Sequence, residues 1–172
     1  EDAVLYFADD ILPHIRAKYP EVKFYIVGQY PTHRVQKLAE RPGIIVTGRV
    51  EDVKPYIAQA AVYVVPLRMG SGTRLKILEA LAMEKAVVST RIGEEGLNLI
   101  DGEEILIADE PSRFADAVLR LLTDKQMRRR IGESGRRRVE ADYDWRQIGE
   151  KLHQLYEKIR RIEPVEIVKR DT

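Results

Sequence analysis

The amino-acid sequence predicts an α/β fold, a doubly wound parallel sheet with helices on both faces. The chain has 172 residues, of which 44% are apolar, and this is enough for one domain with an ordinary core. Up to Glu110, apolar residues at helical spacing alternate with short continuous apolar runs that end at glycine or proline. Strands that are apolar on both faces and alternate with helices are typical of a parallel sheet covered on both sides.

The first element is a helix, because the apolar residues from Val4 to Ile15 keep helical spacing. A short strand over 23–27 follows and ends at Gly28. Further helices are expected over 33–39, 53–60 and 73–83, and further strands over 43–47, 62–65, 86–90 and 105–108. A doubly wound sheet normally starts with a strand, so a helix in first place predicts that the chain is part of a longer protein.

The last third of the chain predicts three helices. The first begins at Pro111, and we expect the side chain of Asp109 to cap it. A basic helix should span 125–141, and a third helix should begin at Asp144, whose carboxylate can cap it. The third helix carries its apolar residues on one face: Trp145, Ile148, Leu152, Leu155 and Ile159.

Composition excludes several classes of site. There is no cysteine, which rules out disulfides, thiolate zinc sites and cysteine nucleophiles. The three histidines lie far apart and lack ligand spacing, so we expect no metal: His14, His33 and His153. No apolar run approaches the roughly 20 residues that cross a bilayer, and we expect a cytoplasmic protein. Residues 1–162 should form one domain, followed by a short tail over 163–172.

A glycine-rich turn lies between the strand over 62–65 and the helix that follows it. Ligands of open α/β sheets bind where strands end in this way. Gly70 and Gly72 lack side chains, so the backbone can approach a ligand closely. Free N–H groups at a helix start suit a phosphate, and nearby cations add to this. The residues expected to supply these groups are Thr73, Arg74, Leu75 and Lys76.

Glu79 lies about one and a half turns further along the same helix. Its carboxylate can accept two hydrogen bonds from a vicinal diol such as ribose. A phosphate site followed by a diol acceptor predicts a nucleotide. The alternative is that the glycines only form a turn and that Glu79 is a solvated helix residue.

The turn belongs to a longer pattern, Gly-Ser-Gly-Thr-Arg-Leu-Lys-Ile-Leu-Glu-Ala-Leu-Ala over 70–82, followed by Ala-Val-Val-Ser-Thr over 86–90 and Glu-Gly-Leu over 95–97. This pattern resembles the C-terminal, donor-binding half of GT-B glycosyltransferases, and most closely the retaining family 4. The resemblance extends over nearly the whole chain. It implies a Rossmann-like half of a GT-B fold with C-terminal helices, and a missing N-terminal domain that carries the acceptor site.

The resemblance also implies site residues. The family signature is two glutamates eight positions apart, and Glu79 matches the second, which holds the ribose hydroxyls. The first, which normally contacts the transferred sugar, falls on Ser71, a departure. The backbone of Arg49 and Val50 would meet the base. Gly28 would let its strand approach the donor, or would simply form a strand-end turn.

Two further positions follow from the same likeness. A donor contact is expected at the loop that contains Glu95, with an ordinary exposed loop as the alternative. Glu84 stands where the family usually ends the helix with glycine. It should either adopt the left-handed conformation, at a cost of about 1 kcal/mol, or avoid it by fraying of the helix end.

The implied activity is transfer of a sugar from a nucleoside diphosphate to an acceptor, with retention. The helix N-terminus with Arg74 and Lys76 would stabilise the diphosphate charge without a metal. The expected partners are a nucleotide sugar, the missing domain, and an acceptor glycan, lipid or protein. The chain alone should be inactive. A sugar-nucleotide epimerase of the same fold is one alternative, and a non-catalytic binding module, permitted by Ser71, is another.

Nucleic acid is not an expected partner, although arginines cluster over 128–130 and 136–138. The net charge is only +1, and acidic residues alternate with these arginines: Glu133, Glu140 and Asp142. We therefore expect a solvated helix face, with weak peripheral attraction to anionic lipid as the lesser alternative.

Overall fold

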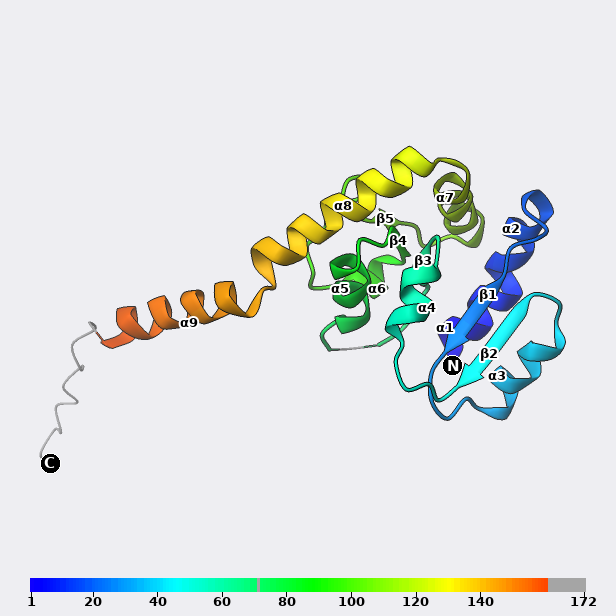
Figure 1. Cartoon of the computed structure of the whole chain (residues 1–172), viewed down its shortest axis with the longest axis horizontal. Helices are drawn as coiled ribbons and strands as arrows, with labels where there is room; N and C mark the ends of the chain where they lie inside the picture. The colour runs from blue at the N-terminus through cyan, green and yellow to red at the C-terminus, as the bar shows by residue number, and fades with distance from the viewer. Residues whose placement is uncertain (71, 161–172) are drawn as a thin grey trace, which may run out of the picture.

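Parallel strands form two small sheets in the computed structural model, which describes residues 1–70 and 72–160 (Figure 1). Strand β1 (Phe24–Val27) pairs with β2 (Ile44–Gly48). Strand β4 (Val87–Ser89) lies between β3 (Tyr63–Val65) and β5 (Leu106–Ile107). Every pairing is parallel, so the predicted α/β class is confirmed.

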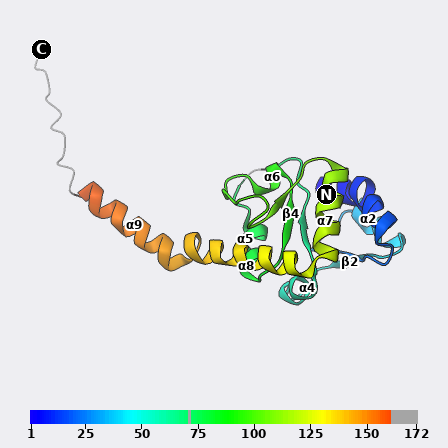
Figure 2. The same cartoon turned by 90° about the horizontal axis from the view of Figure 1, so that it is seen from above.

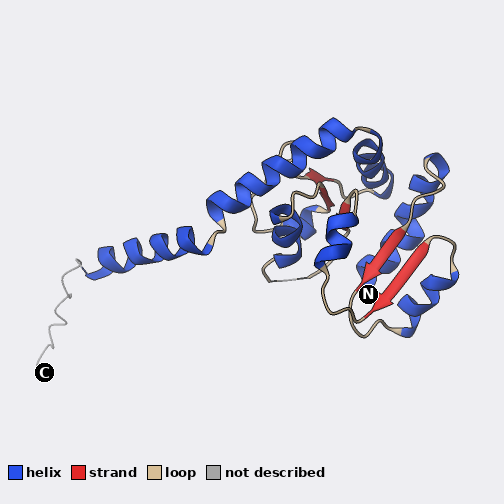
Figure 3. Ribbon diagram, in the orientation of Figure 1, coloured by secondary structure: helices blue, strands red, loops and turns tan. Residues whose placement is uncertain are grey.

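Helices connect and cover these strands (Figure 3). A nearly continuous helix with one wider π-helical turn comes first, and three helices come last. The helices before the last three are α1 (Asp2–Tyr6), the π segment (Phe7–Ile11), α2 (Leu12–Lys18), α3 (His33–Lys37) with a 3-10 turn (Leu38–Glu40), α4 (Lys54–Gln59), α5 (Leu75–Ala82) and α6 (Arg91–Glu94). The last three are α7 (Pro111–Thr123), α8 (Lys125–Asp142) and α9 (Trp145–Arg160).

Strand β4 is buried on both faces, because it has a strand on each side and helices above and below. Successive side chains of a strand point to opposite faces. Val88 packs in a cluster that contains Ile11 of the π segment and Phe114 of α7. Val87 packs in a second cluster that contains Ile77 of α5. Helices therefore cover both faces of this sheet.

Helix α8 crosses the end of α5 at close range (Figure 2). Two glycines permit the approach. A Cβ atom on Gly132 would lie 2.2 Å from the carbonyl oxygen of Glu84, and one on Gly135 would lie 2.5 Å from Leu81. Glu84 itself has a φ of +57°, so it adopts the left-handed conformation expected of a residue in the place of a helix-ending glycine.

Helix α9 extends away from the rest of the described chain (Figures 1 and 2). The carboxylate of Asp144 accepts a hydrogen bond from the N–H of Arg146 at 2.8 Å, as expected of a cap. The predicted apolar face is exposed, with Trp145 84% accessible. Neither α9 nor any other helix in the described residues is both long and apolar enough to cross a bilayer.

Some predicted element ends were wrong. Strands over 86–90 and 105–108 are shorter than expected, and helix α6 was not expected at all. Asp109 does not cap α7; its carboxylate accepts the N–H of Arg91 at 2.8 Å instead. The reason is that the strand end brings Asp109 next to the start of α6. The predicted tail over 163–172 lies outside the described residues.

Candidate functional site

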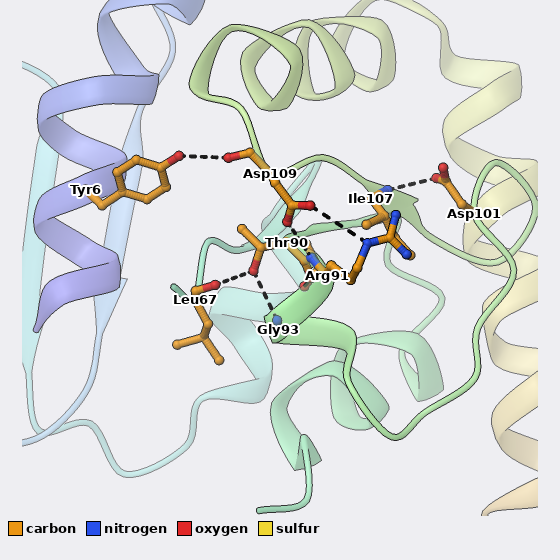
Figure 4. A network of polar contacts seen from close by, with 9 residues as sticks. Tyr6, Leu67, Thr90, Arg91, Gly93, Asp101, Ile107 and Asp109 are labelled. Atoms are coloured by element: carbon orange, nitrogen blue, oxygen red, sulfur yellow. Dashed lines mark hydrogen bonds and ion pairs between the residues drawn. The ribbon is translucent and has the colours of Figure 1, made fainter. Parts of the chain in front are cut away.

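Three loops meet at the carboxyl edge of the β3–β4–β5 sheet, where parallel strands end together. Their side chains hold one another in place (Figure 4). The hydroxyl of Thr90, after β4, donates to the carbonyl of Leu67, after β3. The same hydroxyl accepts the N–H of Gly93 at 3.0 Å and so caps α6. Asp109, after β5, accepts from the backbone of Arg91. The loops are therefore tied together beside the glycine turn.

Helix α1 anchors this edge from the other side. The hydroxyl of Tyr6 donates to the carbonyl of Asp109 at 3.0 Å, and burial raises the pKa of Tyr6 above its usual value (Figure 4). The phenol is therefore protonated at neutral pH and donates. The guanidinium of Arg68 lies 4.4 Å from the Tyr6 ring centroid and pairs with Asp2, and this hydrogen bond lowers the pKa of Asp2. These contacts fix the chain just before the glycine turn.

The glycine turn needs glycine for its backbone conformation. Gly70 has a φ of +142° and Gly72 a φ of +88°, values that residues with a side chain rarely adopt. A Cβ on Gly72 would meet no atom within 4 Å, so the described surface is open here. Ser71 lies outside the described residues. The backbone at Gly72 is thus accessible to a ligand.

Helix α5 begins at Leu75, two residues later than predicted. The N–H of Leu75 donates to the carbonyl of Thr73 at 2.9 Å. The prediction that this N–H is free was therefore wrong. Lys76 is exposed and makes no hydrogen bond or ion pair with a described residue. Of the predicted phosphate-binding groups, Lys76 is therefore the cation open to solvent.

Arg74 lies under the turn. Its side chain is only 7% exposed; one Nη donates to the carbonyl of Gly70 at 3.1 Å and lies 3.4 Å from Oε2 of Glu95. The pair links the turn to the loop after α6. The sequence singled out both residues, but it gave no signal that they contact each other, because they are 21 positions apart.

Glu79 lies on the exposed side of α5 and makes no hydrogen bond or ion pair with a described residue. Burial raises the pKa of Tyr63, and the negative charge of Glu79 adds to this effect. Both carboxylate oxygens of Glu79 are thus available to accept hydrogen bonds from a ligand.

The remaining predicted residues follow the strands of the other sheet. Gly28 is exposed after β1, and a Cβ there would meet no atom within 4 Å. Arg49 is exposed and Val50 is half-buried after β2. Among the described residues, no hydrogen bond or ion pair connects these three to the glycine turn.

The contacts of Tyr6, Thr90 and Asp109 at this edge were not predicted from the sequence. Thr90 and Asp109 each follow a short apolar strand, and this placement is the signal that could have found them. No comparable signal marks Tyr6, which reads as one apolar position of a helix.

Two hollows elsewhere contain none of the predicted site residues. One, of about 510 Å³, lies beside β5 and α7, where Arg91, Arg113 and Arg120 alternate with Asp101, Asp109 and Asp116. The other, of about 440 Å³, lies at the amino edge of the sheet and is lined by Lys85 and Arg128 among others. Within residues 1–70 and 72–160, no three His, Asp or Glu side chains are grouped as metal ligands.

Comparison with known proteins gives a family match. The model described as Glycosyl transferases group 1 matches residues 1–124. The phosphatidyl-myo-inositol mannosyltransferase of Mycobacterium tuberculosis is 27% identical over 160 residues, which are 87% of this chain and 42% of that protein. The chain spans about a third to two fifths of the length of the first curated relatives it matches.

Solved structures of glycosyltransferases share the fold. Sucrose-phosphate synthase from Thermosynechococcus elongatus is 25% identical with a TM-score of 0.70, covering 87% of this chain and 41% of that one. The Anabaena protein HepE in complex with UDP is 15% identical with a TM-score of 0.73, covering 86% of this chain and 44% of that one.

Proposed function

The chain belongs to the glycosyl transferases group 1 family and has the fold of a GT-B glycosyltransferase domain, and from this premise we propose that it binds the nucleoside-diphosphate sugar used in glycosyl transfer. The observation that carries the proposal is the open turn at Gly72, followed by Lys76 and then Glu79 on one exposed helix start. An accessible backbone and a cation come first along the chain and suit the phosphates of a nucleotide. A carboxylate follows and suits the ribose.

The proposal gives each group one role. The open backbone of the turn and Lys76 would contact the diphosphate, where the positive end of α5 adds to the attraction. Glu79 would accept hydrogen bonds from the two ribose hydroxyls. About 6 Å of helix separates Leu75 from Glu79, so the two contacts are made along one element. Gly28 and the backbone of Arg49 and Val50 stay in the proposal as contacts toward the base.

In the reaction, the bond between the sugar and the diphosphate breaks and negative charge develops on the leaving diphosphate. Groups already aimed at that charge lower the barrier. Lys76 and the helix start would supply this stabilisation, with Arg74 acting from beneath the turn. The proposal includes transfer with retention of configuration and membership in family 4. It also includes a hexose as the transferred sugar and a cytoplasmic location.

The acceptor side of the reaction is not assigned to these residues. Because the chain spans only part of its curated relatives, we propose that acceptor binding and turnover need a further domain. Residues 1–172 alone should bind donor without transferring sugar. The mannosyltransferase relative makes a lipid-linked acceptor one class to test with a longer protein, with glycans and proteins as the others.

The test is a calorimetric titration of the parent chain and Glu79→Gln with nucleoside diphosphates, starting with UDP because HepE was solved with UDP. The substitution keeps the size of the side chain but removes charge-assisted hydrogen bonds, so affinity should fall about ten- to a hundredfold. The loss should be much smaller for the 2′,3′-dideoxy analogue. Equal binding of the normal nucleotide by both proteins would remove the basis of the proposal.

A further inference from the structure

The ion pair between Arg74 and Glu95 has no role in the function proposed so far. Arg74 is buried beneath the glycine turn, whereas the side chain of Glu95 is 72% exposed. Oε2 of Glu95 lies 3.4 Å from one Nη of the guanidinium. Most of the Glu95 side chain is therefore exposed to solvent even though it pairs with a buried cation. A carboxylate that pairs with a buried guanidinium and is otherwise exposed to solvent can accept hydrogen bonds from a ligand.

The neighbouring glutamate is engaged differently. The carboxylate of Glu94 accepts the N–H of Leu99 at 2.8 Å and so closes its own loop. Glu95 caps the end of α6 and is followed by Gly96 with a φ of +86°. The backbone therefore turns sharply at this point, and Glu95 alone of the two is directed to Arg74.

Arg74 connects Glu95 to the turn. The same Nη atom that approaches Glu95 donates to the carbonyl of Gly70 at 3.1 Å. The planar guanidinium can hold two acceptors in fixed positions, which an ammonium group does less well. Glu95 is thus positioned relative to the first residue of the turn, and Glu79 lies on the helix that follows the turn.

We propose that Glu95 accepts hydrogen bonds from hydroxyl groups of the transferred sugar and that Arg74 is the positioning residue that holds it there. The inference rests on the proposed function, because the glycine turn is taken as the diphosphate site. A carboxylate accepts hydrogen bonds and donates none, so hydroxyls suit it and phosphate oxygens do not. Glu95 therefore belongs at the sugar end of the donor.

The experiment compares a nucleoside diphosphate with its own sugar derivative. Parent chain and Glu95→Gln are titrated with UDP and UDP-glucose, and with the GDP–GDP-mannose and ADP–ADP-glucose pairs, and the pair that the parent binds most tightly is used. In Glu95→Gln, affinity for the nucleotide sugar should fall about tenfold. Affinity for the bare diphosphate should stay the same or rise, since a negative charge has been removed. Glu103→Gln, an exposed loop glutamate with no side-chain contact to a described residue, is the matched control and should change neither affinity.

Arg74→Lys tests the positioning role. It keeps the charge but loses the planar fork, so discrimination between nucleotide sugar and diphosphate should weaken in the parent background. In the Glu95→Gln background it should add no further loss of discrimination. Melting temperatures of all variants separate these effects from unfolding.

The outcomes distinguish a failure of the proposed function from a failure of the role of Glu95. If the parent binds no nucleotide at all, the proposed function fails and the sugar contact fails with it. If the parent binds both ligands and Glu95→Gln weakens both equally, or neither, the proposed function stands and the role of Glu95 is wrong.

Discussion

Basic side chains at the two ends of the β3–β4–β5 sheet are used in different ways. At the amino end, the ammonium of Lys85 donates to the carbonyls of Ala58 and Ala60, at 2.6 and 3.4 Å. Arg128, from α8, donates to the carbonyl of Leu121 at 2.9 Å. At the carboxyl end, Lys76 is exposed with no described partner.

This difference distinguishes cations that stabilise the fold from cations whose charge is open to a ligand. A helix end leaves carbonyls without partners in the helix, and a nearby lysine or arginine can satisfy them. Lys85 and Arg128 do this, so the charges of these two side chains are engaged by backbone carbonyls. Lys76 lies at a helix start, where the backbone presents donors, and its charge remains available for an anion.

The largest effect on stability should come from adding a side chain where α8 packs closely on the end of α5. Gly132→Ala places a Cβ atom 2.2 Å from the carbonyl oxygen of Glu84, so the free energy of unfolding should fall by about 1 to 3 kcal/mol. Gly149→Ala is the control: this helical glycine has open space around it, and alanine should stabilise α9 slightly. Denaturant unfolding measures both. Equal stability of the two variants would contradict the close packing of α8 on α5.

Replacing Lys76 and Lys85 by methionine, one at a time, tests this comparison of the two ends of the sheet. Lys76→Met should weaken nucleotide binding about tenfold and leave the unfolding free energy within about 0.5 kcal/mol. Lys85→Met should lower that free energy by about 1 kcal/mol and leave nucleotide affinity unchanged, because two carbonyls lose their donor. Calorimetric titration gives the nucleotide affinity of each variant, and thermal melting gives its stability. The comparison is wrong if Lys85→Met is the variant that loses affinity.

Tyr6 gives the carboxyl edge a sensitivity to alkaline pH. Its pKa is raised in the folded state, so the stability it contributes is full below the unfolded pKa of about 10 and is lost as pH rises through the folded value. Tyr6→Phe lacks the hydrogen bond to Asp109 and should be about 1 kcal/mol less stable at pH 7. Its melting temperature should also decline less steeply above pH 10. A parallel decline in both proteins would assign the alkaline loss to Tyr63 and Tyr143, whose pKa values burial also raises.

The smallest effect is expected on α8, where two arginines form ion pairs with glutamates of the same helix. Arg129 and Arg136 form ion pairs with Glu133 and Glu140, at 2.6 and 2.7 Å. Binding to a DNA oligonucleotide should be weak and should disappear by about 0.2 M salt, because contacts to phosphate alone are strongly screened. Fluorescence anisotropy over a salt series measures this. Persistent binding would mean that the arginines are available after all.

The sequence predicted what depends on local chemistry. The glycines of the turn, the helix after it and the exposed position of Glu79 all follow from residue type and spacing. For Glu84 two outcomes were left open, a left-handed backbone or a frayed helix end, and the structure has the left-handed backbone. These features are decided within a few residues of chain, which is why a single sequence suffices for them.

Features that depend on contacts between distant segments were not predictable. Asp109 was expected to cap α7. Its carboxylate instead accepts the N–H of Arg91, because the start of α6 lies next to it. The contact of Arg74 with Glu95 joins two residues that are 21 positions apart. The division of the strands into two sheets likewise depends on how the helices pack, and no periodicity encodes it.

The bond between Tyr6 and Asp109 also has a consequence for how the chain folds. It joins residues 103 positions apart, and the ring of Phe7 packs on that of Phe114 across a similar separation. Contacts of such long range slow folding, because a large loop must close before they form. During synthesis the first helix must therefore remain without its contacts to α7 until α7 has left the ribosome, and the part of its apolar face that packs on Phe114 stays open to chaperones or to aggregation.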